Sequence, residues 1–456
     1  MVCSRYSPEI PDLVYREARV STIEHSASAT ALLDESVGRS AVRKASWRLL
    51  PLIALGYGMA YMDRVNISFA SLHMNRDLHF SATVYGLGAG FFFLSYAVCE
   101  IPSNLLLLRF GARRWLARIM VTWGALAVAM VFVRTPVQFY GARFFLGMAE
   151  AGFFPGVVFY LMQWFPPEMR ARAVSRFYIS LPLSSVVMGL LAGALLNLQG
   201  RLGLAGWQWL FLVEGLPSIA LGIVFLFCLP DTPAHAAWLA PEEQDWLLRR
   251  IREDAALGGH SEDVGRALRD PRVWQLGLLS LCMLGSNYAY TFSAPAILKG
   301  LTSFNVTNVG FLLAAMNVLG AAGMILNAIH SDRVRERYWH VIVPFLVVTA
   351  GYLVGGLSSL PWIAVPALAV AVISYSSLQG PLLSIPAIFL KGRSAAAGIA
   401  AMNTIGILGG FIGPYWMGLA KDFTGDYQRG LLTLTIPSFA AGAIMFAMSR
   451  SLRARL

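Results

Sequence analysis

Charged residues are scarce in this chain of 456 amino acids, because only 13% are Asp, Glu, Lys or Arg whereas 57% are hydrophobic. A soluble globular domain carries about 25% charged residues, so the composition excludes an ordinary soluble enzyme. Its four cysteines, Cys3, Cys99, Cys228 and Cys282, are far apart and show no metal-ligand or redox spacing. They indicate packing residues in a chain without disulfides.

The sequence also lacks the motifs of an ATP-driven machine or a catalyst. No glycine-rich loop that ends in Lys-Ser or Lys-Thr is present to hold the phosphates of a nucleotide. No pair of nucleophile and base, and no set of metal ligands, occurs at a useful spacing. The sequence therefore predicts a protein that is not an enzyme and that uses no cofactor and no metal.

What the chain does contain is long apolar runs. A helix needs about 20 residues to cross a hydrocarbon core about 30 Å thick. Runs of this length, separated by charged or turn-rich breaks, predict twelve transmembrane helices. Their spans are 49–72, 83–107, 115–133, 138–164, 173–197, 208–229, 273–297, 306–330, 339–358, 361–390, 395–420 and 430–449.

Lysine and arginine fall mainly on one side of these spans. With the amino terminus inside, the termini and the even-numbered connections hold 28 of the 36 basic residues, and the odd-numbered connections hold six. Short positively charged loops stay on the cytoplasmic side, so we expect both termini in the cytoplasm and the chain in the inner membrane. The net charge of +11 is mostly this topological signal. Nucleic-acid binding is the competing interpretation, but no recognition module is present.

A long polar connection divides the spans into two groups of six. The expected regions are a flexible cytosolic tail (1–48), an amino-terminal bundle (49–229), a cytoplasmic linker (230–271), a carboxy-terminal bundle (272–450) and a cytosolic end (451–456). Within the linker, Pro241 followed by two glutamates predicts a helix start. Two six-helix halves around a midplane site are known in secondary transporters. The predicted fold class is therefore an all-α membrane protein of twelve transmembrane helices in two six-helix bundles.

The two halves align weakly at an offset of 224 residues. This offset matches Arg109, in NLLLLRFGARR, with Arg333, in AIHSDRVRER. It also places Asp63 of the first span over Asn287 of the seventh. The alignment suggests that the first half supplies titratable groups and the second half supplies neutral hydrogen-bonding groups.

Two pairs of charged residues inside predicted spans are the main candidates, Asp63 and Arg64 in the first span and Arg143 and Glu150 in the fourth. Because an ionised side chain near the bilayer centre costs roughly 2.5 to 3.5 kcal/mol, such residues usually face a polar interior or an ion path. A guanidinium suits a carboxylate substrate, so Arg64 is the candidate anion ligand. Asp63 and Glu150 can take up and release protons. Arg143 and Glu150 project from one helix face about 10 Å apart, so Arg143 is the third candidate residue for proton coupling.

Polar side chains in other spans complete the candidate substrate site. Tyr96 lies in the middle of the second span, and Asn403 lies beside GILGGFIGP in the eleventh. Asn287 and Tyr290 are three residues apart and share a helix face, whereas Tyr288 is turned by about 100°. We therefore predict substrate contacts at Asn287 and Tyr290.

Structural alternatives exist for each of these residues. Asp63 and Arg64 could form a static pair with other helices, and Arg143 could mainly hold helices together. Asn403 either binds substrate or stabilises helix packing. Sodium is an alternative to the proton, since carboxylate and carbonyl oxygens suit it as well.

Several segments resemble the major facilitator superfamily and, within it, the anion:cation symporter family of tartrate, galactonate, glucarate, phthalate and hydroxyphenylacetate permeases. They are YMDRVNISFA, IPSNLLLLRFGARRW, RFFLGMAEAGFFPG, WFPPEMRARA, GWQWLFLVEGLPS and LPDTPAHAAWLAPEE. The resemblance covers nearly everything beyond residue 45. It implies coupling acids at the positions of Asp63 and Glu150, and substrate-facing groups at Arg64 and Tyr96.

One departure from the superfamily pattern concerns the cytoplasmic loop signature, which places an aspartate just before the arginine. Here Leu108 precedes Arg109 in the first half, whereas the second half keeps Asp332 and Arg333. A gating charge pair is therefore expected from Asp332 and Arg333 only.

The resemblance implies a secondary active transporter that carries a small organic anion, a tartrate-like hydroxy dicarboxylate or a sugar acid, together with protons. The alternatives are a proton-driven exporter of another small molecule and a membrane receptor that does not transport. The expected partners are the anion, protons and membrane lipids, with no nucleic acid, and the expected state is a monomer.

Overall fold

The computed structural model describes residues 10–257, 269–386 and 392–453, and these residues fold as helices without a β-strand. The main helices are α1 (Ile10–Asp77), α2 (Ala82–Phe110), α3 (Ala112–Ala129), α4 (Pro136–Glu150), α5 (Phe153–Met162), α6 (Pro167–Tyr178), α7 (Ser180–Leu196), α8 (Gly206–Cys228), α9 (Pro241–Leu257), α11 (Pro271–Leu301), α12 (Val306–Val334), α13 (Trp339–Leu357), α14 (Pro361–Ser384), α16 (Gly392–Thr424) and α17 (Tyr427–Arg453). A short 3-10 turn, η1 (Met130–Phe132), follows α3.

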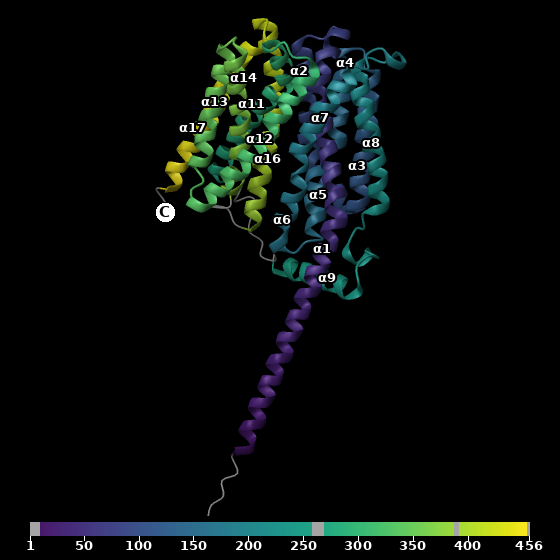
Figure 1. Ribbon diagram of the computed structural model, residues 1–456, viewed down its shortest axis with the longest axis vertical. Coiled ribbons are helices and arrows are strands. Elements are labelled where there is room, and N and C mark those ends of the chain that lie inside the picture. The colour runs from purple at the N-terminus through teal and green to yellow at the C-terminus, as the bar shows by residue number, and fades with distance from the viewer. Residues whose placement is uncertain (1–9, 258–268, 387–391, 454–456) are drawn as a thin grey trace, which may run out of the picture.

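These helices form two bundles that stand side by side (Figure 1). Each bundle has its own hydrophobic core, one built from α1 to α9 and one from α11 to α17. The predicted all-α, twelve-span fold is confirmed, and each predicted span falls on a helix where the structure describes it; residues 387–390 of the tenth span lie outside the described residues. The fourth span is divided into α4 and α5, and the fifth into α6 and α7.

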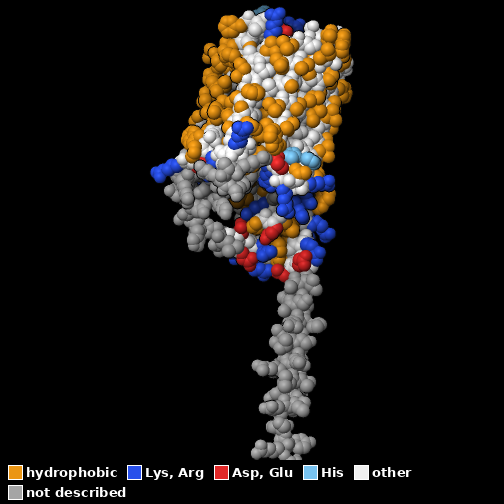
Figure 2. All heavy atoms as spheres, turned by 90° about the vertical axis from the view of Figure 1, so that its left-hand side faces the viewer, with side chains coloured by type: hydrophobic (Ala, Val, Ile, Leu, Met, Phe, Trp, Pro, Cys, Tyr) orange, Lys and Arg blue, Asp and Glu red, His pale blue; other side chains and the backbone are white. Residues whose placement is uncertain are grey.

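Nine of the described helical stretches are long and apolar enough by themselves to cross a membrane. The other three predicted spans lie in α1, α11 and α16, which carry Arg64, Asn287 and Asn403. Hydrophobic side chains cover the outer face seen in Figure 2, and charged side chains gather mainly at the lower end of the coloured part of this view. The chain is therefore a multi-pass membrane protein with a polar interior.

Helix α1 starts at Ile10 and runs without a break into the first span, so residues 10–48 of the predicted flexible tail are helical. Residues 1–9 lie outside the described residues. The predicted linker helix is present as α9 and begins at Pro241. Lys44 Nζ lies 2.8 Å from the Glu243 carboxylate, and Asp34 pairs with Arg249. These contacts fasten α9 to the amino-terminal bundle, while residues 258–268 of the linker lie outside the described residues.

The bundles meet at the end that carries the odd-numbered connections. A Cβ atom on Gly86 of α2 would lie 2.2 Å from the Pro414 carbonyl oxygen of α16. One on Gly189 of α7 would lie 2.5 Å from the Gly310 carbonyl oxygen of α12. Only glycine permits backbones to approach so closely. Closure of this end therefore depends on the absence of side chains at these positions.

Replacement of Gly86 by valine is expected to open this end, because the added carbons would overlap the Pro414 carbonyl. Spin labels at Arg76 and Phe423, both exposed, would report the separation of the two bundles by pulsed electron resonance in a background without native cysteines. We expect the distance distribution to move to longer values. Gly141→Val, where a Cβ meets nothing within 4 Å, serves as the control, and an unchanged distribution in Gly86→Val would contradict the argument.

A carboxylate also joins the bundles at this end. Asp422 of α16 accepts hydrogen bonds from the backbone N–H groups of Ala82 (3.2 Å) and Thr83 (2.8 Å), in the first turn of α2. Burial raises the pKa of Asp422, but hydrogen bonds from Thr83, Ala82 and Ser81 outweigh burial and hold this pKa below its ordinary value. The ionised form is further favoured by the helix dipole.

Acid is expected to weaken this contact. A carboxyl group whose pKa is lowered in the closed state stabilises that state at pH values above the ordinary pKa of the group, which is about 3.9. This stabilisation is lost as the pH falls through the lowered pKa. The same spin-label distance should therefore lengthen in strong acid. Asp422→Ala should lengthen it at neutral pH and remove the pH dependence, whereas a pH-dependent distance that survives in Asp422→Ala would point to another group.

Candidate functional site

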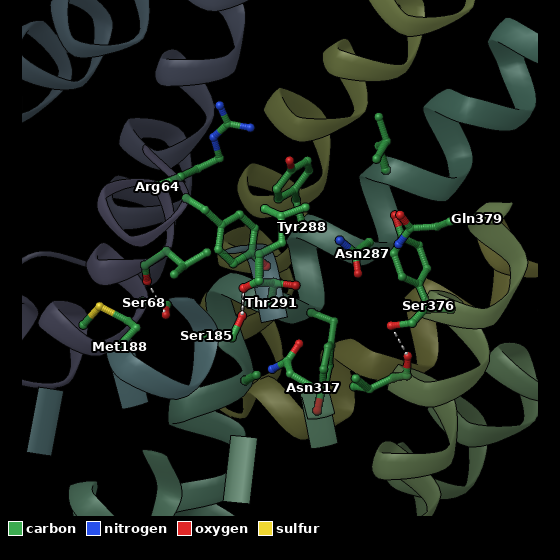
Figure 3. A pocket seen from close by; sticks show the side chains of 18 of the residues that line it. Arg64, Ser68, Ser185, Met188, Asn287, Tyr288, Thr291, Asn317, Ser376 and Gln379 are labelled. Atoms are coloured by element: carbon green, nitrogen blue, oxygen red, sulfur yellow. Dashed lines mark hydrogen bonds between the residues drawn. The ribbon is translucent and has the colours of Figure 1, made fainter. Parts of the chain in front are cut away.

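A cavity of about 370 Å³ lies between the two bundles (Figure 3). On α2, the contact with α16 at Gly90 is followed along the helix by the lining residues Tyr96 and Glu100. On α12, the contact at Gly310 is followed by Asn317. The cavity thus lies on the side of the bundle contacts that faces the two termini.

All five residues that the sequence predicts to bind substrate line this cavity. They are Arg64, Tyr96, Asn287, Tyr290 and Asn403. They come from α1, α2, α11 and α16, so the fold brings together residues that are more than 300 positions apart. Their role in binding remains a prediction.

Tyr288 also lines the cavity, although the helical-wheel argument turns it away from Asn287 and Tyr290. Its ring centroid lies 4.3 Å from that of Phe93 of α2, across the boundary between the bundles. The cavity wraps around α11 widely enough to include both faces. The expectation that only the helix face with Asn287 and Tyr290 lines the substrate site was therefore too narrow.

The guanidinium of Arg64 connects the cavity with the interior of the amino-terminal bundle. It forms an ion pair with Glu150 of α4. Its Cζ also lies 5.4 Å from the ring centroid of Phe92 and 5.3 Å from that of Tyr96. The Arg64 side chain is 19% exposed and that of Glu150 is 1% exposed, so the cation reaches the cavity while its acid partner stays buried.

A break in the fourth span places Glu150 at this position. Helix α4 ends at Glu150, Ala151 leaves the helical conformation, and Gly152 follows at φ 86°. Few residues other than glycine adopt such a φ, and a Cβ on Gly152 would lie 2.4 Å from Ser103 Oγ. Helix α5 then begins at Phe153 and has Pro155 in its first turn, so the break precedes the proline. Such breaks free backbone groups inside a membrane protein.

Arg143, two turns before Glu150 on α4, is fully buried. Its Cζ lies 4.8 Å from the ring centroid of Phe92. Within the described residues, none of its three guanidinium nitrogens has a hydrogen-bond partner. A buried guanidinium that is not fixed by hydrogen bonds can respond to charge changes nearby, because unpaired charge is costly in a medium of low dielectric constant.

Asp63 faces the interior of the amino-terminal bundle rather than the cavity. It is 1% exposed, and its Oδ1 lies 3.4 Å from Asn66 Nδ2. The same amide donates to Glu214 of α8 at 2.6 Å. Sequence reasoning did not select Asn66 or Glu214, although Glu214 is an acid inside a predicted span and the criterion that selected Asp63 and Glu150 would have found it.

The carboxy-terminal wall of the cavity is polar but carries no charge among its described lining residues. Figure 3 shows Thr291, Asn317, Ser376 and Gln379 on the wall beside Asn287. Of these five residues, only Asn287 was predicted from the sequence. Amides inside the apolar spans 306–330 and 361–390 are the signal that would have found Asn317 and Gln379.

The predicted gating residues lie outside the cavity, at the end of α12. Asp332 is 3.7 Å from Arg337, and this pair is largely exposed. Arg333 is exposed as well. In the first half, Asp231 of the linker segment accepts a hydrogen bond from the backbone N–H of Arg113 at 3.0 Å. A gating role for Asp332 and Arg333 remains a prediction, with Arg337 as the observed partner of the aspartate.

Comparisons with known proteins agree with this architecture. A model of the Major Facilitator Superfamily matches residues 53–414. The "Putative tartrate transporter" of Agrobacterium vitis is 43% identical over 407 residues, which cover 89% of each chain. The "Quinolone resistance transporter" of Acinetobacter baumannii is 38% identical over 400 residues, which cover 87% of this chain and 92% of that protein.

A solved structure is similar in fold. It is a bacterial homolog of the human lysosomal transporter Spinster in an inward-facing and occupied conformation, with a TM-score of 0.74 at 17% sequence identity. It covers 88% of this chain and 96% of that chain. Both the relatives and the fold are those of transporters rather than enzymes. The chain belongs to the Major Facilitator Superfamily and is a membrane transporter similar to its anion:cation symporters.

Proposed function

We propose that the protein is a proton-coupled symporter of a small organic anion that works by alternating access in the inner membrane. The observation that carries this proposal is the position of Arg64, a cation that reaches the central cavity and is paired with the buried acid Glu150. Tartrate-like hydroxy acids and sugar acids are the proposed substrate class. The relative from Agrobacterium vitis, which bears the name of a tartrate transporter, supports this choice.

The charge distribution on the cavity wall favours a hydroxylated carboxylate. Arg64 is the one Lys or Arg among the described lining residues. A guanidinium binds a carboxylate in a two-point geometry. On the opposite wall, Asn287, Asn317 and Gln379 offer neutral donors and acceptors that match hydroxyl groups. The substrate would place one carboxylate at Arg64 and its hydroxyl groups toward the carboxy-terminal bundle.

Proton coupling would arise from competition for Arg64. A substrate carboxylate and the Glu150 carboxylate need the same guanidinium, and two anions beside one buried cation are unfavourable. A proton on Glu150 would remove its negative charge and free Arg64 for the substrate. Asp63, near Arg143, would take up a second proton. Loss of these protons on the cytoplasmic side would restore the pair of Arg64 with Glu150 and expel the anion.

The conformation of the bundles suits the release step of this cycle. The bundles touch at the end with the odd-numbered connections, and the cavity lies toward the termini. With both termini in the cytoplasm, as the distribution of basic residues indicates, this arrangement is inward-facing. Alternating access would require the contacts at Gly86 and Gly189 to separate.

Transport by purified protein in liposomes tests the proposal. Labelled tartrate and galactonate would be offered with an inward proton gradient, with a sodium gradient at equal pH, and with neither. We expect accumulation above the external concentration with the proton gradient alone. Accumulation that is equal with and without the proton gradient, or that follows sodium, would refute the coupling.

A proton-driven exporter is the second candidate, and the quinolone resistance relative supports it. The cavity wall also carries aromatic rings that suit a flat apolar compound, namely Tyr57, Tyr61, Phe154, Tyr178 and Tyr288. Arg64 argues against cationic cargo. Efflux of a quinolone from inside-loaded liposomes, without competition by tartrate or galactonate, would favour the exporter.

A further inference from the structure

The amino-terminal bundle contains a third buried acid that the proposed cycle does not use. Glu214 of α8 is 6% exposed, and it is the one charged residue of that helix. Asn66, on α1 one turn after Asp63, is fully buried between the two acids. Its Nδ2 lies 2.6 Å from Glu214 Oε2 and 3.4 Å from Asp63 Oδ1. The same amide nitrogen of Asn66 therefore lies within hydrogen-bond distance of two carboxyl groups, and its contact with Glu214 is the shorter one.

No cation opposes Glu214 in the described surroundings. Helix α8 packs against α1, α3, α7 and η1. The titratable residues of α3 are Arg113, Arg114 and Arg118, and none follows Arg118 in this helix. Helix α7 and the turn η1 contain no titratable residue. From α1, the titratable group that faces Glu214 is Asp63, while Arg64 of the same helix pairs with Glu150. An ionised carboxylate in this position would be desolvated without compensation, whereas Asp63 has Arg143 nearby.

We propose that Glu214 is a positioning residue for proton exchange at Asp63: it remains protonated and draws the Asn66 amide away from the Asp63 carboxylate. This inference rests on the proposed role of Asp63 in proton coupling. A hydrogen bond to a carboxylate stabilises its ionised form. By holding Asn66 at 2.6 Å, Glu214 leaves Asp63 with only the 3.4 Å contact. Asp63 therefore keeps its proton to a higher pH than it would if the amide were free.

Three oxygen atoms without hydrogen-bond partners in the described structure are consistent with an Asn66 amide that donates mainly to Glu214. Asp63 Oδ2, Asn66 Oδ1 and Glu214 Oε1 are buried, and none has a hydrogen-bond partner among the residues that the structure describes. Asp63 is thus under-supplied with donors as a carboxylate, a state that favours its protonated form. Proton uptake at Asp63 would relieve this deficit without a large rearrangement.

The test measures Asp63 directly by infrared titration of the purified protein, with the Asp63 carboxyl band identified by its loss in Asp63→Asn. Glu214→Leu removes the competing acceptor at similar volume, so Asn66 can donate fully to Asp63. We expect the midpoint of Asp63 protonation to fall by roughly one pH unit, since a charge-assisted hydrogen bond is worth at least about 1.4 kcal/mol. Glu214→Gln keeps an uncharged acceptor for Asn66 and should leave the midpoint unchanged.

A double-mutant cycle separates this effect from general damage to the fold. Asn66→Ala removes the contested donor and should move the midpoint upward. In the Asn66→Ala background, Glu214→Leu should have no further effect. If Glu214→Leu fails to fold, the upward shift in Asn66→Ala together with the unchanged midpoint in Glu214→Gln still tests the proposal.

Several outcomes would overturn the inference. One is an equal shift in Glu214→Gln and Glu214→Leu, which would make Glu214 itself a proton exchanger. Another is an unchanged midpoint in both Glu214→Leu and Asn66→Ala. The proposed function fails separately, if the wild-type protein in liposomes shows no gradient-driven transport, because the infrared titration requires no transport.

Discussion

Arg64→Ala is expected to abolish specific binding of the organic anion. Arg64 is the one cation among the described cavity residues, so its loss leaves the substrate carboxylate with neutral partners. Removing one partner of a buried, hydrogen-bonded charge pair costs about 2 to 5 kcal/mol, which corresponds to roughly 30-fold to several-thousand-fold weaker binding. Isothermal calorimetry or a thermal-shift titration with tartrate and galactonate would measure the effect.

The design of this experiment must account for Glu150, which Arg64→Ala would leave buried without its partner. Breaking such a pair destabilises a fold by about 3 to 5 kcal/mol. The double variant Arg64→Ala/Glu150→Gln removes the stranded charge and should fold while still failing to bind. Arg76→Ala, at an exposed arginine outside the cavity, is the matched control. Binding that persists in the folded double variant would exclude Arg64 as the anion ligand.

The fold was predictable from the sequence because the membrane imposes a simple length rule. Apolar runs of about 20 residues mark the predicted spans, and the polar linker marks the division into halves. The breaks inside spans were less predictable, since they depend on backbone conformation at single residues. Gly152 shows this, because its positive φ lies at the break where α4 ends, directly after Glu150.

The cavity residues were predictable only where a residue type is unusual in a membrane. Charged Arg64 and the amides Asn287 and Asn403 stand out in apolar spans, and the structure places all three on the cavity wall. The position of Tyr288 on that wall depends on how α11 meets α2, which one sequence does not reveal. The bridge from Asp63 through Asn66 to Glu214 joins spans one and six, and local periodicity carries no information about such a contact.

Glu150→Gln is expected to separate substrate binding from proton coupling. In the wild type, the Glu150 carboxylate occupies Arg64 and competes with the substrate. Glutamine has a similar shape but no charge, so it resembles the protonated acid at every pH. The anion should then bind Arg64 about tenfold more tightly at high pH than in the wild type, since release from an ion-pair competitor is worth about 1.4 kcal/mol. The pH dependence of binding should become shallower.

The consequence for transport follows from the same competition. Without a proton to exchange at Glu150, the loaded carrier can still change conformation, so exchange of labelled for unlabelled substrate across liposomes should continue. Accumulation driven by a proton gradient should fall at least about tenfold, because the work of the gradient no longer reaches the anion at Arg64. Glu168→Gln, at an exposed acid outside the cavity, is the control. Because exchange and accumulation use the same bundles and the same cavity, loss of both in Glu150→Gln would indicate a structural role for the acid. Retention of both would place the coupling at Asp63 alone.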